Sequence, residues 1–304
     1  MADLSTKIGS VTLKNPVLTA SGCFGYGDEV SGILDVNRLG GLVTKSITVR
    51  SRLGNRPPRT CETPAGMINS IGLANVGLDR FVTEKLPLYT ELDTRIIVNV
   101  AGDTLEDYCR VVEGIDAAGG HIDGYEINIS CPNTDQGGIF FGEDAAQCFR
   151  VMQAVRQRTR KLLIAKLTPN VTDVAPIAQA AADAGADCVS MINSMVGMAI
   201  NPITRKPRIA SIMGGLTGPC IRPIAIAQVF EVAAAVDIPI IGIGGIGTHL
   251  DALEFILAGA SAIQVGTANF YDPLASVKIV EALAAFLDER GIARITDLIG
   301  AVEY

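Results

Sequence analysis

The segment YEINISCPN, residues 125–133, places polar and reactive side chains at the end of an apolar run. Asn128, Ser130 and Cys131 follow residues that are typical of a buried strand, and Pro132 and Asn133 come directly after them. A protein core rarely takes such side chains, because burying a polar group without a partner costs free energy. We therefore predict that this strand ends in the floor of an active site.

Other predicted strands also end in residues that could bind a ligand. These are Ser21, Lys45 with Ser46, Asn99, Lys166, Asn193 with Ser194, Gly244 with Gly245, and Gly266 with Thr267. Each has an ordinary explanation when it is taken alone, since an Asn can satisfy loop backbone and a strand-end Lys can reach solvent. In a barrel all of these positions would converge on one mouth, and we interpret them as one site.

The segments GIGGI and VGTANF follow the last two predicted strands. Many barrels bind a phosphate at this place through backbone N–H groups. Ordinary tight turns would also use such glycines, but Thr267 adds a hydroxyl donor. Lys45 and Lys166 are expected to face the barrel axis with little carboxylate nearby. Two such cations suit a ring that becomes negative on reduction, such as the N1–C2=O edge of a flavin.

Short apolar runs alternate with Ala-rich helical patterns along the chain. The predicted strands are Pro16–Ala20, Gly41–Thr44, Arg95–Val100, Gly124–Ile129, Leu162–Lys166, Asp187–Ile192, Pro239–Ile243 and Ala262–Val265. The predicted helices include Leu105–Ala118, Asp144–Arg160, Asp173–Ala184, Ile224–Ala235 and His249–Leu257. Thr248 and Thr172 are predicted to cap the helices that follow them. Continuous apolar runs of this kind indicate parallel strands that are covered on both faces.

Eight strand–helix units predict a TIM (β/α)8 barrel, as a single domain over residues 1–304. An N-terminal hairpin, DLSTKIGSVTLKNPV, is expected to close its bottom, and the long connections 46–77 and 193–221 to wall a pocket on the catalytic face. The alternative is a doubly wound Rossmann-like fold, because GIGGIG (242–247) matches G-x-G-x-x-G. A dinucleotide site would need an acidic residue about 20 positions further on, where the chain instead reads AGASA.

Composition excludes several functions. The net charge is −7 and no Lys/Arg block is present, so we expect no nucleic-acid partner. No apolar run is long enough to span a membrane, and the segment MADLSTKIGS does not resemble an export signal, so a cytoplasmic location is expected. The seven cysteines are scattered and the two histidines lie far apart in sequence, which offers no metal or iron–sulfur site.

The motifs NISCPN, GMINSIGLAN, TKS, AKLTPN, MINS, GGLTGP, GIGGI and VGTANF together resemble the class 1 dihydroorotate dehydrogenases, which are FMN-containing TIM barrels of pyrimidine (UMP) biosynthesis. The similarity runs in order over nearly the whole chain. Two longer segments, RPPRTCETPAGMINSIGLANVGL and RKPRIASIMGGLTGPCIRPIAI, look more like the NAD-linked (class 1B) catalytic subunit than like the fumarate-linked form.

This resemblance implies a role for each matching residue. Cys131 would be the base that removes the C5 proton of dihydroorotate while the C6 hydride passes to flavin N5. The substrate would be surrounded by Lys45, Asn69, Ser70, Ile71, Gly72, Leu73, Asn128, Asn193 and Ser194. FMN would be held by Ser21, Lys45, Ser46, Asn99, Asn128, Lys166, Ile192, Gly218, Gly244, Gly245, Gly266 and Thr267.

The implied partner is a separate subunit that carries FAD and a [2Fe–2S] cluster, assembled with a homodimer of barrels into a heterotetramer. Its need is consistent with this chain, which offers neither a dinucleotide site nor a cysteine cluster. The chain departs from relatives at Thr134-Asp135-Gln136, where they often carry a basic residue.

The residue chemistry agrees with these roles. A cationic surround lowers a thiol pKa from about 8.5 towards neutrality, which would suit Cys131 as a base. Amides at Asn69, Asn128 and Asn193 offer donors and acceptors to a flat ring of N–H and C=O groups. The segment DQGGIFFGE (135–143), with Gly137, Gly138 and Gly142, has the character of a lid that excludes water.

Three alternatives stay open at this point. The first is a fumarate-linked class 1 enzyme. The second is a flavin-dependent dihydropyrimidine dehydrogenase-like barrel, which uses a similar cysteine as a general acid. The third is a phosphate-binding regulatory barrel without redox activity.

Overall fold

The computed structural model describes residues 2–130 and 141–303, and its centre is a closed barrel of eight parallel strands. Around the barrel the strands are β3 (Val17–Thr19), β4 (Gly41–Val43), β7 (Arg95–Val100), β8 (Gly124–Asn128), β9 (Leu162–Lys166), β10 (Cys188–Met191), β15 (Ile240–Ile243) and β16 (Ala262–Val265). Strand β16 pairs with β3 and closes the ring. Each strand lies within its predicted run, so the TIM barrel is confirmed and the Rossmann-like alternative is wrong.

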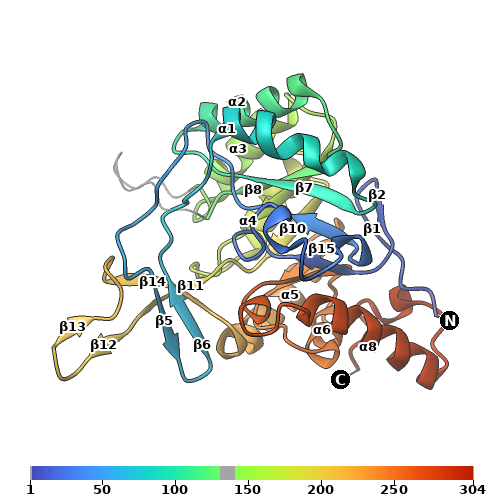
Figure 1. Cartoon of the computed structure of the whole chain (residues 1–304). Helices are drawn as coiled ribbons and strands as arrows, with labels where there is room; N and C mark the ends of the chain where they lie inside the picture. Colours follow the sequence, from blue (N-terminus) through green and yellow to red (C-terminus); the bar gives the residue numbers. More distant parts are fainter. Residues whose placement is uncertain (1, 131–140, 304) are drawn as a thin grey trace.

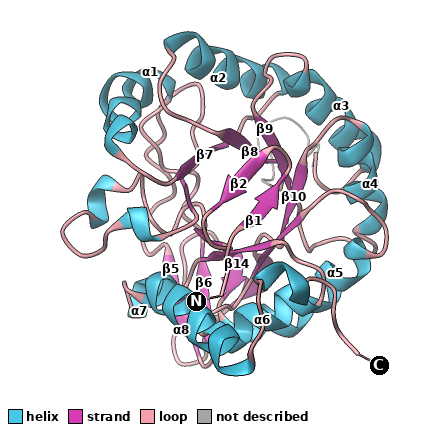
Figure 2. Cartoon of the chain, turned by 90° about the vertical axis from the view of Figure 1, so that its right-hand side faces the viewer, coloured by secondary structure: helices cyan, strands magenta, loops and turns pink. Residues whose placement is uncertain are grey.

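Helices form a layer outside the barrel (Figure 2). They are α2 (Leu105–Ala118), α3 (Ala145–Arg156), α4 (Ala175–Asp183), α5 (Arg222–Ala233), α6 (His249–Leu257) and α8 (Ala275–Arg290). The bounds of α2 and α6 match the prediction, whereas α8 was not predicted. Two short helices, α1 (Leu78–Arg80) and α7 (Ala268–Tyr271), precede α2 and α8.

The two predicted helix caps have different outcomes. Thr248 caps α6 as predicted, because its hydroxyl accepts from the N–H of Asp251 and the Asp251 carboxylate accepts in return from the N–H of Thr248. The cap at Thr172 was wrong. Helix α4 begins at Ala175, and the Asp173 carboxylate, which lies closer to that start, accepts from the N–H of Ala175.

The N-terminal hairpin closes the bottom of the barrel, as predicted. Strands β1 (Thr6–Ile8) and β2 (Val11–Leu13) are antiparallel and lie across the centre of the ring (Figure 2). The side chains of Ile8 and Leu13 are fully buried in one apolar cluster with residues of the barrel strands, among them Leu18, Ile97 and Ile164. This plug seals the end of the barrel that lies opposite the carboxyl ends of the strands.

The two long connections combine into a second sheet, which was not predicted. Its order is β11 (Met195–Met198), β14 (Met213–Thr217), β6 (Gly66–Asn69) and β5 (Thr60–Thr63). A small hairpin, β12 (Ile200–Asn201) with β13 (Lys206–Pro207), extends from it. The sheet projects from the side of the molecule away from β1 and β2 (Figure 1). The connections therefore stand at the mouth of the barrel.

Candidate functional site

A fully buried carboxylate, Glu126, lies inside the barrel beneath the mouth. Its Oε1 atom accepts from Asn99 Nδ2 at 2.6 Å and from Lys166 Nζ at 3.0 Å. Its Oε2 atom accepts from Ser190 Oγ at 2.8 Å and from Gln264 Nε2 at 2.6 Å. The expectation that Lys166 would have little carboxylate nearby was wrong. The physical reason is that a buried cation needs a buried partner.

The hydrogen-bond network around Glu126 favours the ionised form of its carboxyl group. Burial would raise the pKa of Glu126, but the Lys166 ammonium and the hydrogen bonds from Gln264 and Ser190 outweigh it and hold the pKa below its ordinary value. The network also reaches the mouth. Ser46 Oγ donates to Asn99 Oδ1 at 2.5 Å, and Lys166 Nζ lies 3.4 Å from Ser21 Oγ.

The sequence carried a signal for Glu126 that the prediction missed. In the run 124–129 it is the only charged residue, and residues 126 and 128 share one face of the strand because side chains alternate. Since Asn128 was expected to face the mouth, Glu126 had to point inward as well. A charge at such a position must be paired, and Lys166 stands at the end of the neighbouring strand.

Amide groups come together above this network. Asn193 Nδ2 donates to Asn128 Oδ1 at 3.2 Å, and Asn193 Oδ1 accepts from the N–H of Ser194. Asn128 is buried, and its carbonyl accepts from the hydroxyl of Tyr108. The ends of β8 and β10 thus present side-chain amides at one place, with donors and acceptors that suit a polar ring.

The projecting sheet brings Asn69 to the same region. Asn69 Nδ2 donates to the carbonyl of Gly215 at 3.2 Å, and a Cβ on Gly215 would overlap Ser194 Oγ. Asn69 of β6 and Ser194, which follows β10, therefore both lie beside Gly215. Ser70, the next residue, accepts from Asn55 Nδ2 at 2.7 Å.

The turn that follows β6 has an unusual backbone. Gly72 and Leu73 have φ angles of 73° and 52°, in the left-handed region. Asn75 is buried beside them, and its Nδ2 donates to the carbonyl of Leu73 and to Thr48 Oγ1. The predicted positions Ile71 to Leu73 are therefore held in one conformation by contacts with the segment after β4.

The glycine turns after β15 and β16 lie against each other and against the end of β14. A Cβ on Gly245 would lie 2.7 Å from the carbonyl oxygen of Gly218, and one on Gly218 would lie 3.6 Å from Thr267 Cγ2. A Cβ on Gly244 would approach Ile192 at 3.5 Å, and one on Gly266 would meet Cys23 Sγ at 3.3 Å. Six predicted residues thus lie in one region: Ile192, Gly218, Gly244, Gly245, Gly266 and Thr267.

These turns present unpaired donors. The backbone N–H groups of Gly244, Gly245, Gly266 and Thr267 donate no hydrogen bond to any residue within 2–130 or 141–303. Backbone N–H groups in folded proteins are almost always paired. Four free donors at the ends of two adjacent strands fit a bound anion such as a phosphate.

Lys45 differs from Lys166. It is half-buried after β4, and among the residues that the structure describes it forms no ion pair. Burial raises the pKa of the Cys23 thiol. The ammonium groups of Lys166 and Lys45 lower this pKa, but by less than burial raises it. Cys23 therefore stays a neutral thiol at neutral pH, even though both ammonium groups lower its pKa.

The predicted base Cys131, the departure at Thr134-Asp135-Gln136, and the glycines Gly137 and Gly138 lie outside the described residues. Of the predicted lid, the structure describes residues 141–143, in which Phe141 and Gly142 are buried and Glu143 is exposed. Phe141 is buried and meets Tyr108 edge-on, with ring centroids 6.0 Å apart.

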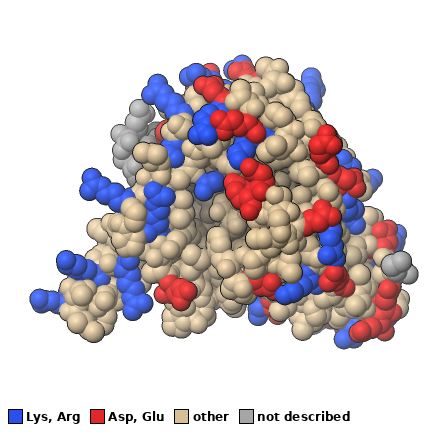
Figure 3. Space-filling view, in the orientation of Figure 1, with Lys and Arg blue, Asp and Glu red and all other residues tan. Residues whose placement is uncertain are grey.

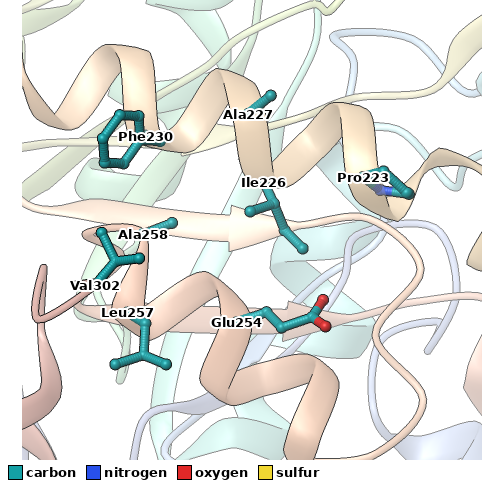
Figure 4. A pocket seen from close by; sticks show the side chains of 8 residues that line it. All are labelled: Pro223, Ile226, Ala227, Phe230, Glu254, Leu257, Ala258 and Val302. Carbon is teal, nitrogen blue, oxygen red and sulfur yellow. The ribbon is translucent and has the colours of Figure 1, made fainter. Parts of the chain in front are cut away.

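Two surface features complete the description. Segments 50–59 and 205–208, on and beside the projecting sheet, contain only basic charged residues, and this side of the molecule is basic in Figure 3. Of these basic residues only Arg52 forms an ion pair with a described residue, Asp103. A groove of about 860 Å³ runs between α5 and α6. Apolar side chains such as Phe230 and Leu257 line it (Figure 4), and it contains none of the predicted site residues.

In the described part of the chain, no helix is long and apolar enough to cross a membrane. Within the same ranges, no three His, Cys, Asp or Glu side chains come together as a metal site would require.

The parallel barrel and the polar groups at the carboxyl ends of its strands are those of a TIM-barrel enzyme. Residues 3–287 match the family model described as dihydroorotate dehydrogenase, and the chain belongs to this family. It is 51% identical to the "Dihydroorotate dehydrogenase B (NAD(+)), catalytic subunit" of Geotalea uraniireducens, over 99% of this chain and 98% of the relative. Proteins with the same name in Geobacter sulfurreducens (50%; 99% and 98% covered) and Bacteroides thetaiotaomicron (48%; 100% and 100% covered) are also similar to it.

Proposed function

We propose that the chain is the FMN-binding catalytic subunit of an NAD-linked dihydroorotate dehydrogenase and that residues 1–304 act as one domain in the cytoplasm. The reaction is the oxidation of (S)-dihydroorotate to orotate in pyrimidine biosynthesis. The family match supports the reaction. The observation that carries the proposal is the meeting, at one mouth, of free backbone donors, two lysines and a row of amides.

The residues of the mouth fit FMN. The N–H groups of Gly244, Gly245, Gly266 and Thr267, which donate to no described residue, would bind its phosphate, and Lys166 with Ser21 would face its ring. Ser46 and Asn99 would hold the ring edge together with Lys45. When bound, FMN supplies the two-electron acceptor that takes the hydride from C6 of the substrate.

The chain's own groups would orient the substrate and move the proton. We assign the C5 proton to Cys131, in the role that the sequence predicts. Asn69, Asn128 and Asn193 offer amides to the N–H and C=O groups of dihydroorotate. The ammonium of Lys45, which forms no ion pair within the described ranges, can attract the substrate carboxylate. The basic segments 50–59 and 205–208 raise the local concentration of such an anion.

We further propose that the final acceptor is NAD and that a second subunit, with FAD and a [2Fe–2S] cluster, passes electrons to it. A homodimer of barrels would assemble with two such subunits into a heterotetramer. The relatives are named catalytic subunits of an NAD(+) enzyme, which supports a partner. The described residues of this chain contain no cysteine cluster for an iron–sulfur centre.

The test is steady-state NADH formation by the purified chain with excess FMN, with and without the partner. We expect turnover of dihydroorotate with an artificial acceptor in both cases, but NADH only with the partner. Robust NADH formation by the chain alone would refute the two-subunit proposal. Efficient fumarate reduction would assign the chain to the fumarate-linked form, and reaction with uracil in place of dihydroorotate would favour a dihydropyrimidine dehydrogenase.

A further inference from the structure

Glu126 has no place in the proposed chemistry, yet it is among the most constrained side chains of the barrel. It is fully buried, and its two oxygens accept four hydrogen bonds. The donors come from four different strands, namely Asn99 of β7, Lys166 of β9, Ser190 of β10 and Gln264 of β16. The carboxylate is therefore fixed relative to strands on both sides of the barrel, because it can move only if several of these bonds break.

Lys166 depends on this carboxylate for its position. Its side chain is 6% exposed, and within the described residues Glu126 is its one carboxylate partner. The contact with Ser21 Oγ is longer, 3.4 Å against 3.0 Å for the ion pair. A long lysine side chain has many rotamers, so the buried ion pair is what selects the one that places the ammonium below the mouth.

We propose that Glu126 is a positioning residue that acts on the flavin through Lys166. It holds the buried ammonium of Lys166 at a fixed place below the mouth, where a cation would favour the reduced, more negative form of a bound flavin. This inference rests on the proposed function, because it takes the mouth to be the flavin site. Glu126 touches neither flavin nor substrate in this scheme.

The test uses four forms of the full-length protein: the natural chain, Glu126→Gln, Lys166→Met, and the double variant. Glutamine keeps the shape of the side chain and one acceptor oxygen while it removes the charge. Asp123→Asn is the matched control, since Asp123 precedes the same strand and pairs with Arg95 at the other end of the barrel, 3.0 Å away. The first readout is the midpoint potential of bound FMN. The second is the free energy of unfolding of the flavin-free proteins.

We expect Glu126→Gln to weaken the preference for reduced over oxidised flavin at least tenfold, which lowers a two-electron potential by about 30 mV. In the Lys166→Met background the same change should have less than a threefold effect, and Asp123→Asn should leave the potential unchanged. The inference is overturned by a potential that rises or stays constant in Glu126→Gln, or by a decrease of the same size in both backgrounds.

Unfolding of the flavin-free forms separates this inference from the proposed function. We expect the two substitutions to be non-additive, as for residues in contact. Additive effects would overturn the inference even if FMN binds. If the natural chain takes up no FMN, the proposed function fails, while additivity or non-additivity still decides whether Glu126 holds Lys166.

Discussion

Replacing Lys166 by methionine should destabilise the flavin-free protein far more than the same replacement at Lys45. Lys166 is 6% exposed and pairs with a carboxylate that is fully buried. Removing one partner of a buried ion pair costs about 3–5 kcal/mol, because the other charge stays behind. Asn99, Ser190 and Gln264 would still donate to Glu126, so we expect the low end, about 3 kcal/mol. Lys45 has no ion pair among the described residues, and its replacement should stay within about 0.5 kcal/mol.

The stability loss in Lys166→Met should also depend on pH, which provides a second test of the same reasoning. In the natural chain the lowered pKa of Glu126 contributes stability that is present above the pKa of the unfolded chain and lost as pH falls through the folded value. Without the Lys166 ammonium, burial dominates and the pKa of Glu126 should rise above its ordinary value. The variant can then protonate Glu126 in mildly acidic solution. The stability difference from the natural chain should therefore be largest near pH 7.5 and should narrow towards pH 5.

The assay is urea-induced unfolding of flavin-free protein, followed by circular dichroism at both pH values, with Lys45→Met measured in parallel. A loss below about 1 kcal/mol for Lys166→Met at pH 7.5 would refute the reasoning, since it would mean that the carboxylate is not left uncompensated. The reasoning would also fail if the loss were the same at pH 5 and at pH 7.5.

Three other predictions concern separate parts of the molecule. Cys131→Ala should keep FMN and bind orotate but lose most flavin reduction in anaerobic stopped-flow experiments, and a near-normal rate at neutral pH would remove it from the role of base. Gly245→Ala should weaken FMN retention measured by fluorescence titration, because its φ of 72° and the nearby carbonyl of Gly218 leave no room for a methyl group; unchanged affinity would argue against a phosphate at this turn. Leu13→Ala should lower the free energy of unfolding by about 3 kcal/mol through a cavity in the plug and leave FMN affinity unchanged, whereas a large loss of affinity would show that the plug supports the mouth.

The strands of the barrel could be predicted because parallel strands that are buried on both faces have continuous apolar sequences. Helix α6 could also be predicted, since Thr248 and Asp251 have the types and spacing of a capping pair. Thr172 looked similar but stood too far from the helix start, where Val174 is the N-cap and no side-chain cap hydrogen bond forms. Short-range patterns of this kind identify a helix better than they identify its first residue.

The parts that escaped prediction depend on contacts between distant segments. Strands β5 and β14 lie in two connections that are far apart in sequence, and neither connection alone shows that they share a sheet. The pairing of Glu126 with Gln264 joins residues 138 positions apart. Resemblance to a family assigned roles to residues at the mouth, but it assigned none to the carboxylate that lies beneath them.

The pairing of β16 with β3 has a consequence for the order in which the chain is made. Strand β3 leaves the ribosome early, and its second neighbour follows roughly 240 residues later, which corresponds to roughly 10–50 s of synthesis at usual rates. Until then one edge of β3 is without its partner strand and can pair with another nascent chain. The hairpin β1–β2 cannot bury Ile8 and Leu13 fully during this interval, because Ala262 of β16 belongs to the same cluster. The yield of folded protein should therefore depend on how long this unfinished ring is protected, and slower translation before β16 would lengthen its exposure.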